Sequence, residues 1–544
     1  MASSNTSIPD VCSDLAPDTD MNYWKAAVII ILVLLYRVNT LYAITPLGKK
    51  VFPLMCSVLL IVLQVASPLE CYCAIHDNFS TLLTLMGMMI FSAVLEKNHV
   101  MPVLRRLITG GPSWMRSRQI FLLRVSFVTV IISALITNDC CCVLMVPLVV
   151  EGMKELEFRD EASVKVTLLA VTMSSNIGAT LLPMGSPQTL IIFGTDGLTF
   201  SDFLYYMSGP VIVAFLLNYA GLITYYYCYT KCLASKQQKE SSLNEELLVD
   251  VSSDGEPEVA ARSTIKRKKS HLYNEAKGGS AFPKRHLSWG KNAYKANMKQ
   301  GDSRKCKQIK VAMLLVLLVL YPIYLIIGDR YPDLPGVGEI GWTSMLLGSL
   351  GLLVNWGYAD HLLNKEVDWG IIIFFIGAFS LMSTLVNRGV ALVPVEVFFT
   401  PQSQWTFLHS STATTTTQAI NVTTTTTTVA TSALQSLQNS FQVTASTLLL
   451  CNVIGNVPLV LVVLSVLKWN KMLLLLLSYV AAIAGNLTFI GAATHIIVSE
   501  HETKLITPKD ITSYGIISTI PLIVIGVVII WGMMECNDPF SDNC

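Results

Sequence analysis

Long apolar runs separated by short polar stretches dominate this sequence from Trp24 to Met534. Many of the runs reach or approach the ~20 residues that an α-helix needs to cross a bilayer. The strict alternation of apolar and polar residues that marks a membrane β-barrel is absent. The pattern therefore predicts an all-α polytopic membrane protein.

Four of the runs are interrupted near their centres by polar, glycine- or proline-bearing sequence. They are Ile120–Val150, interrupted by Thr137-Asn138-Asp139; Val166–Phe193, interrupted over 174–188; Thr444–Leu467, interrupted over 452–458; and Leu473–Val498, interrupted over 484–494. Hydrocarbon cannot satisfy unpaired backbone groups, so these stretches must face protein or a wet cavity. We interpret the first and third as re-entrant hairpins and the second and fourth as broken helices.

The same order of interrupted segments in both halves is typical of inverted repeats with a binding site at their interface. Each repeat is predicted to hold three spans, a re-entrant hairpin, a broken helix and a final span. The predicted domains are an extracellular tail (1–23), a first repeat (24–230), a linker (231–308), a second repeat (309–535) with a Thr-rich extracellular insertion at about 400–440, and a second extracellular tail (536–544).

Charge gives the predicted orientation. Only 14 % of the 544 residues are charged, against about 25 % in soluble domains, which excludes a soluble enzyme and a nucleic-acid-binding module. The basic linker is placed in the cytoplasm, since clustered Lys and Arg stay inside. Both termini are then extracellular, and the sequons at Asn5, Asn78 and Asn421 lie outside as glycosylation candidates, which favours the plasma membrane.

Two low-complexity segments and the cysteines add less. The linker is interpreted as a disordered tether, with a docking or anionic-lipid role for 266–269 as the alternative. The Thr-rich insertion reads as an O-glycosylated loop. Five cysteines map to the outside, where disulfides form, and their pairing stays open; they are Cys12, Cys71, Cys73, Cys536 and Cys544. No metal or cofactor motif is evident, and without a nucleotide-binding motif a gradient or an added partner must drive any transport.

Asp139 is the sharpest single chemical signal. It follows Thr137 and Asn138 at the predicted tip of the first hairpin. Ionisable residues at membrane depth are functional candidates by default, and desolvation favours the protonated carboxyl. Asp139 is therefore the candidate proton carrier; the alternative is that it only caps the following half-helix. The second hairpin has Asn456 at the comparable place, so one tip alone is titratable.

The broken helices supply small, hydroxyl and amide side chains, which offer donors and acceptors together. This inventory suits a small hydroxylated solute or a weakly held cation, and the lack of a Lys or Arg cluster argues against a di- or tricarboxylate. The alternative is close helix packing alone. His495 is a second proton-transfer candidate, or a hydrogen-bonded packing residue. Cys140, Cys141 and Cys142 are either thiols for arsenite or inert small hydrophobes.

Four segments resemble a known family of transporters: ALITNDCCCVLMVPLVV, SSNIGATLLPMGSPQTLII, CNVIGNVPLVLVVL and SYVAAIAGNLTFIGAATHIIVSE. They are similar to the ion transporter superfamily and, within it, to the arsenite permease branch. The likeness is greatest to plant-type silicon efflux transporters, which share a TND-x-CC hairpin and an SxNIGxxxxPxGxPQxL helix. The resemblance covers roughly 45–230 and 309–535.

The resemblance implies an elevator-type secondary transporter that moves silicic acid or arsenite outward. Carried over by motif, the hairpin-tip role falls on Thr137, Asn138, Asp139, Asn452, Asn456 and Pro458. The unwound-helix role falls on Ser175, Asn176, Gly178, Gly185, Pro187, Gln188, Gly485, Asn486, Thr488 and Gly491. Related elevator folds are commonly homodimers, although no interface can be assigned from this sequence.

The residues and the resemblance together predict a secondary active transporter, not an enzyme, that exports silicic acid in exchange for H⁺. Silicic acid is neutral near pH 7, so a proton carrier would supply the coupling. The alternatives are an arsenite or antimonite permease, a sodium/proton antiporter of the same superfamily, and, from another class, a metalloid channel. The expected partners are the solute and membrane lipid, with no nucleic acid, no metal and no cofactor.

Overall fold

The fold is known from a computed structural model. It describes residue 12 and residues 23–42, 48–98, 100–112, 116–158, 160–195, 197–253, 304–331, 339–399, 425–467, 469–501 and 506–536. These residues form helices and connecting turns, with no β-strand among them. The predicted all-α class is thereby confirmed.

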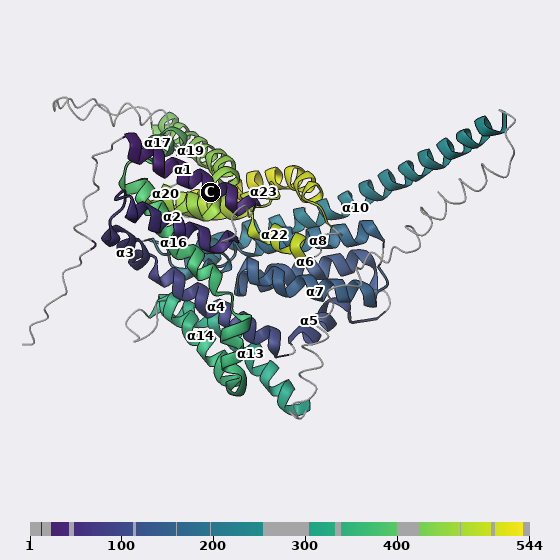
Figure 1. Cartoon of the computed structure of the whole chain (residues 1–544), viewed down its shortest axis with the longest axis horizontal. Coiled ribbons are helices and arrows are strands. Elements are labelled where there is room, and N and C mark those ends of the chain that lie inside the picture. Colours follow the sequence, from purple (N-terminus) through teal and green to yellow (C-terminus); the bar gives the residue numbers. More distant parts are fainter. Residues whose placement is uncertain are drawn as a thin grey trace, which may run out of the picture.

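Figure 1 shows the helices, which fall into those before and those after residues 254–303. The first half contains α1 (Tyr23–Tyr42), α2 (Gly48–Val62), α3 (Pro68–Asp77), α4 (Phe79–Lys97), α5 (Val100–Thr109), α6 (Arg118–Leu135), α7 (Asn138–Glu155), α8 (Glu161–Gly178), the 3₁₀ turn η2 (Pro183–Gly185), α9 (Pro187–Phe193) and α10 (Phe200–Ser253). The second contains α13 (Arg304–Arg330), α14 (Ile340–Val354), η3 (Trp356–Tyr358), α15 (Ala359–His361), η4 (Leu362–Glu366), α16 (Trp369–Asn387), α17 (Leu392–Phe399), α19 (Thr425–Ile454), α20 (Asn456–Val466), α21 (Lys471–Ala484), α22 (Ala493–His501) and α23 (Pro508–Cys536).

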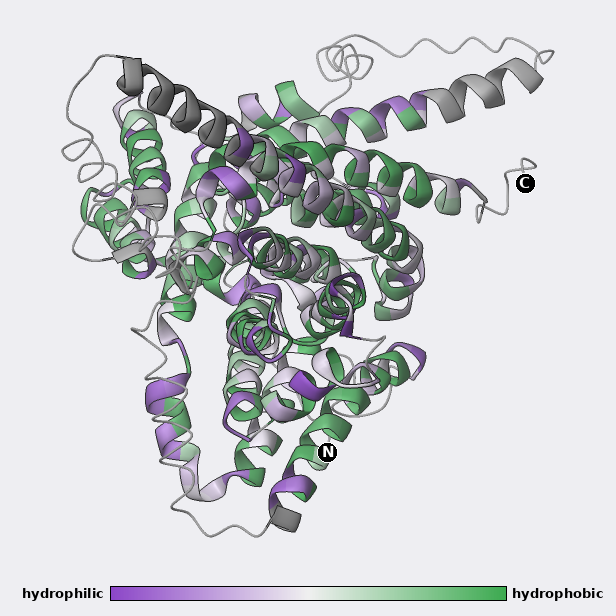
Figure 2. Cartoon of the chain, turned by 90° about the vertical axis from the view of Figure 1, so that its right-hand side faces the viewer, coloured by the Kyte–Doolittle hydropathy of each residue, from purple (hydrophilic) through white to green (hydrophobic). Residues whose placement is uncertain are grey.

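Several helices are suited to a membrane. Within the described residues, α4, α6, α10, α13, α16 and α23 each contain a stretch long and apolar enough to cross a bilayer. Apolar residues cover much of the outer helix surfaces in Figure 2, including exposed Ile30, Ile31, Leu34 and Leu35 on α1. An apolar surface of this kind is stable in lipid, so the prediction of a polytopic membrane protein is confirmed.

Two tight helix pairs cross between the halves: α4 packs along α14, and α2 packs along α16. Small residues permit both approaches. A Cβ added to Gly87 would lie 2.3 Å from the Ser344 carbonyl oxygen, and one added to Gly377 would lie 2.2 Å from the Leu54 nitrogen. The Ser57 hydroxyl also donates to the Gly377 carbonyl at 2.8 Å. Each pair thus joins one helix of the first half to one of the second.

The remaining long helices repeat one packing pattern. In the first half α8 packs against both α6 and α10, and in the second half α21 packs against both α19 and α23. The last helices of the two halves, α10 and α23, pack against each other. Two inverted repeats would produce matched contacts of this kind, and the repeat assignment itself stays a prediction.

A disulfide and an ion pair attach α3 to Cys12 and to the second half of the chain. Cys12 forms a disulfide with Cys73 of α3. Glu70 completes a capping box at the start of α3 and also pairs with Arg388 at the end of α16, with the nearest atoms 2.9 Å apart. The Arg388 Nε donates to the Val65 carbonyl at 2.8 Å. This buried pair therefore ties the α2–α3 turn to the second half.

The predicted domain boundaries can be compared with the helices at a few places. Helix α10 continues to Ser253, past the expected end of the first repeat at 230, and projects from the bundle in Figure 1. Residues 254–303 and 400–424 lie outside the described residues, as do the sequons at Asn5 and Asn421. Asn78 lies between α3 and α4, where its side-chain amide donates to the Ala74 carbonyl at 2.9 Å.

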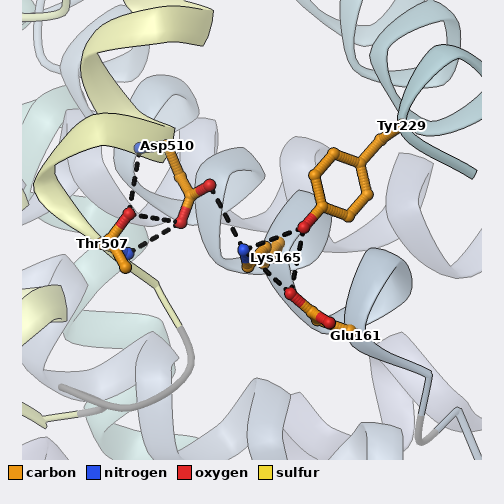
Figure 3. A network of polar contacts seen from close by, with 5 residues as sticks. All are labelled: Glu161, Lys165, Tyr229, Thr507 and Asp510. Carbon is orange, nitrogen blue, oxygen red and sulfur yellow. Dashed lines mark hydrogen bonds and ion pairs between the residues drawn. The ribbon is translucent and has the colours of Figure 1, made fainter. Parts of the chain in front are cut away.

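A polar cluster joins the starts of α8 and α23 to α10 (Figure 3). The Lys165 ammonium lies 3.3 Å from the Asp510 carboxylate, 3.0 Å from Glu161 and 2.9 Å from the Tyr229 hydroxyl. Thr507 donates to Asp510 through its backbone N–H at 2.9 Å and its hydroxyl at 2.7 Å. The hydrogen bond from Lys165 lowers the pKa of Glu161, which lies before the predicted span 166–193. The cluster therefore connects helices of both halves through one cation.

We predict that Lys165→Met lowers the free energy of unfolding by about 1.5–3 kcal/mol, the range for hydrogen bonds to charged groups. Lys165 and Asp510 are each only 14 % exposed, so solvent screens the pair incompletely. Thermal unfolding of Lys165→Met, Asp510→Asn and the double variant gives the coupling between them. Lys509→Met, at an exposed neighbouring position, is the control; additive single effects would contradict the assignment.

Candidate functional site

The two predicted hairpins are pairs of helices joined by very short turns. Helices α6 and α7 meet at Ile136 and Thr137, and α19 and α20 meet at Gly455 alone. Gly455 has φ +100°, a conformation that side-chain-bearing residues rarely adopt. Thr137 is the N-cap of α7, where its hydroxyl accepts from the Cys140 N–H at 3.4 Å. Whether either hairpin is re-entrant in a membrane stays a prediction.

Both predicted broken helices are interrupted, but the first break is shorter than expected. Ser175, Asn176 and Gly178 still belong to the last turns of α8, and Pro187 and Gln188 already belong to α9. The polar side chains of α8 find partners on neighbouring segments, so the helix need not unwind to satisfy them. Helix α8 ends at Gly178, and the chain resumes as η2 and α9; α21 ends at Ala484, and the chain resumes as α22. Close backbone packing surrounds the first break. A Cβ on Gly178 would lie 2.2 Å from the Val130 carbonyl oxygen of α6, and one on Gly185 would lie 2.5 Å from that of Ala179. These glycines are therefore needed for packing.

Three asparagines and a threonine form a buried chain of hydrogen bonds across the two halves. The Asn138 side-chain amide donates to the Asn176 Oδ1 at 3.0 Å, and the Asn176 amide donates to the Asn486 Oδ1 at 2.8 Å. The Thr494 hydroxyl reaches the same Asn176 oxygen at 3.4 Å, and Asn486 donates to the Met173 carbonyl at 3.4 Å. The first hairpin and both broken helices thus meet in one amide network.

A second set of contacts surrounds the tip of the second hairpin. The Thr488 hydroxyl donates to the Asn452 Oδ1 at 2.8 Å, and the Asn452 amide donates to the Ala484 carbonyl at 3.2 Å. A Cβ on Gly491 would lie 2.6 Å from the Gly485 carbonyl oxygen and 2.9 Å from the Asn452 Oδ1. The structure therefore brings together the second-half residues that the sequence singled out, with no room for a side chain at Gly491.

Asp139 and Asn456 each present an oxygen that the rest of the described protein leaves unsatisfied. The Asp139 Oδ1 and the Asn456 Oδ1 are buried and have no hydrogen-bond partner in that part of the chain. The Asp139 backbone N–H is bonded by the Asn138 Oδ1 at 3.0 Å, and the capping of α7 falls to Thr137. Buried polar groups are normally satisfied, so an unsatisfied carboxylate oxygen beside the amide network is a candidate for proton or ligand binding.

His495 is fully buried at the start of α22. Its Nδ1 lies 3.0 Å from the Thr488 carbonyl oxygen, and a carbonyl can only accept, so Nδ1 donates in this contact. Its Nε2 is buried and has no hydrogen-bond partner among the described residues. One ring nitrogen therefore fixes the ring, as a packing residue would require, and the other is a buried acceptor without a partner among the described residues.

The other predicted residues lie around these contacts. The Ser175 carbonyl accepts from the Ser133 hydroxyl at 2.5 Å, and the Ser175 hydroxyl accepts from the Cys142 thiol at 3.3 Å. Pro187, Gln188 and Pro458 are buried. The Cys141 thiol donates to the Thr129 carbonyl at 3.5 Å. No group of three or more His, Cys, Asp or Glu that could hold a metal occurs in the described residues.

Arg37 is a site residue that the sequence analysis missed. It lies in α1, and its guanidinium donates to the carbonyls of Val453 at 2.8 Å and of Asn452 at 3.3 Å, at the end of α19. It also reaches the Ile490 carbonyl, at 3.3 Å, in the second unwound segment. A single arginine inside the apolar run Trp24–Leu41 was the available signal, since charge at membrane depth is rare without a function.

We predict that Asn176→Leu abolishes transport and lowers stability only modestly. Side-chain hydrogen bonds in membrane proteins contribute about 0.6 kcal/mol each on average, so loss of the contacts with Asn138 and Asn486 should leave the protein folded. Thermal unfolding and liposome flux together check this. Thr129→Val is the control, because among the described residues the Thr129 hydroxyl bonds only to the Val125 carbonyl of the same helix. Normal flux through Asn176→Leu would exclude a role in solute binding.

Comparison with known proteins places the whole arrangement in a family. A silicon efflux transporter, LSI3 of Oryza sativa subsp. japonica, is 30 % identical over 182 residues, which are 34 % of this chain and 36 % of that protein. A Dictyostelium discoideum protein named as a transporter, arsB, is 23 % identical over 561 residues, covering 89 % of this chain and 87 % of its own. The inner membrane protein YbiR of Escherichia coli is 27 % identical over 141 residues, 26 % of this chain and 36 % of its own.

The model of the citrate transporter family, CitMHS, matches residues 39–468, most of the chain. That range includes the first hairpin, the first broken helix and the second hairpin, and it ends before α21. Together with the relatives, this match confirms the predicted placement in the ion transporter superfamily and a transport role in place of an enzymatic one. The chain is a membrane transporter that belongs to the citrate transporter (CitMHS) family.

Proposed function

We propose that the protein is a secondary active transporter that exports a small, neutral, hydroxylated metalloid, silicic acid, in exchange for protons. The observation that carries the proposal is the buried chain Asn138–Asn176–Asn486 beside the unsatisfied Asp139 Oδ1. Amide groups both donate to and accept from hydroxyls, so they can replace the hydration of a neutral polyhydroxyl solute. The carboxylate supplies a group that can carry the proton.

The contacts of Arg388 and Arg37 support a neutral solute over a tricarboxylate. Recognition of a carboxylate favours a guanidinium with a free fork of donors. Arg388 is engaged by Glu70 and by the Val65 carbonyl, and Arg37 has its Nε and Nη2 on backbone carbonyls. We therefore place citrate, which the family description names, behind silicic acid as a substrate.

Arsenite is the second candidate. The arsB protein of Dictyostelium discoideum aligns over 89 % of this chain, and arsenious acid is, like silicic acid, neutral near pH 7 and covered in hydroxyls. The same amide network suits both solutes. A sodium/proton antiporter and a metalloid channel remain as outcomes of the test below.

We further propose an elevator mechanism in the plasma membrane, with both termini outside and the linker 231–308 in the cytoplasm. The Cys12–Cys73 disulfide supports this orientation, because disulfides persist in oxidising compartments, and it joins the N-terminal tail to the predicted outer loop 67–80. The matched packing of α6, α8 and α10 with α19, α21 and α23 supports two inverted repeats.

Purified protein in liposomes loaded with silicic acid, arsenite or citrate tests the function under an imposed proton gradient. We expect efflux of silicic acid that depends on the gradient, with proton entry measured at the same time by an internal pH dye. Arsenite or citrate flux without silicic acid flux would replace the proposed substrate. Sodium exchange for protons alone would indicate an antiporter, and flux without any opposing gradient would indicate a channel.

We predict that Asp139→Asn reduces proton-coupled efflux to the level of protein-free liposomes while the protein remains folded. The amide is close in shape to the carboxylic acid but cannot release the coupled proton. Asp77→Asn is the matched control, since Asp77 is an exposed carboxylate at the end of α3. Coupled efflux that persists in Asp139→Asn would remove Asp139 from the mechanism.

A further inference from the structure

Arg37 places a positive charge against the tip of the second hairpin. Its Nε donates to the Val453 carbonyl at 2.8 Å, and its Nη2 donates to the Asn452 and Ile490 carbonyls, each at 3.3 Å. These contacts join α1 to two segments more than 400 positions away in the sequence. The residue is only partly buried, but the three oxygens it contacts are backbone atoms at the centre of the second-half site.

The three carbonyls lie at a helix end or in an unwound segment. Asn452 and Val453 lie in the last turn of α19, where carbonyls have no partner within the helix and the helix end carries partial negative charge. Ile490 lies in the unwound segment between α21 and α22. Carbonyls at the C-terminal ends of half-helices and in unwound segments are the groups with which secondary transporters coordinate a coupling cation.

We propose that the Arg37 guanidinium is a tethered cation, which occupies at the second hairpin the position that a free coupling cation would otherwise take. The second half then needs no sodium ion to close its hairpin tip against the unwound segment. Coupling is left to the first half, where Asp139 lies. The inference deepens the proposed function and rests on it in assigning the coupling proton to Asp139.

The packing around the guanidinium supports a built position. A Cβ added to Gly455, at the turn between α19 and α20, would lie 3.2 Å from the Arg37 Nη1, so the cation lies directly against the hairpin turn. The next residue, Asn456, has a buried Oδ1 that is unsatisfied within the described residues. Removal of the guanidinium would thus leave backbone carbonyls of the kind that coordinate sodium in secondary transporters, with a further oxygen one residue beyond the turn.

Thermal unfolding of the purified full-length protein in NaCl and in choline chloride of equal ionic strength tests the proposal. We expect Arg37→Ala to unfold at a lower temperature than wild type in choline, and to regain much of the loss in sodium with a saturable dose dependence. Wild type should be unaffected by the exchange of cations. Lys25→Ala, on the same helix but outside these contacts, should behave as wild type.

Two further variants separate charge from folding. Arg37→Gln, which is neutral but still donates hydrogen bonds, should be stabilised by sodium even if Arg37→Ala does not fold, whereas Arg37→Lys should not. If the Gln variant is destabilised equally in sodium and choline, Arg37 is a helix cap only and the proposal is overturned. Sodium stabilisation of wild type that persists in Asp139→Asn would also overturn it, because a free ion would then bind with the guanidinium present.

The melting assay does not use transport, so its result is separate from the test of the proposed function. If silicic acid does not move in liposomes, the proposed substrate is wrong, and the proposal that Arg37 is a tethered cation is not affected. If sodium does not stabilise the neutral Arg37 variants, the proposal of a tethered cation is wrong, and the proposal of proton-coupled export through Asp139 is not affected.

Discussion

Backbone that leaves the helical conformation inside an apolar bundle must find its hydrogen-bond partners within the protein, because lipid offers none. Within the predicted spans, the described residues leave it at four places: the tips of the α6–α7 and α19–α20 hairpins and the breaks after α8 and α21. Hydroxyls supply backbone partners at the first tip and the first break, where Thr137 accepts from the Cys140 N–H and Thr189 donates to the Pro183 carbonyl. In the second half the Asn452 amide donates to the Ala484 carbonyl and the Arg37 guanidinium donates to the Val453 carbonyl.

Tight helix pairing places the interruptions together. Glycines such as Gly87 and Gly377 let α4 and α2 approach their partners in the other half at backbone contact, and Gly178 does the same for α8 against α6. Small residues are effective here because helix association in lipid depends on close packing and polar contacts. The hydrogen bond between Asn176 and Asn486 is the result: two residues 310 positions apart meet at the centre of the bundle.

Much of this was predictable because the signals are local in the sequence. A polar interruption within an apolar run identifies a break, and the break after Ala484 and the turns at Thr137 and Gly455 fall within the predicted stretches. The first break is shorter than predicted, because residues 174–178 remain in α8 and residues 187–188 belong to α9. The partners were not predictable, since no periodicity relates Asn176 to Asn486 or α1 to α19. Arg37 was missed for the same reason. Its partners are backbone carbonyls of the other half, and backbone carbonyls carry no sequence signature.

The two hairpin tips therefore differ in one electrostatic respect. The first carries Asp139, a carboxylate with an unsatisfied oxygen, and the second carries neutral Asn456 beside a guanidinium supplied from α1. The membrane potential does no work on a neutral solute. Uphill export therefore requires a charge that the transporter carries in one direction of its cycle and lacks in the other. A titratable group can change charge in this way, and an arginine cannot. If Asp139 exchanges the proton as proposed and Arg37 keeps its charge fixed at the other tip, the transporter would bind the coupling ion in only one of its two halves.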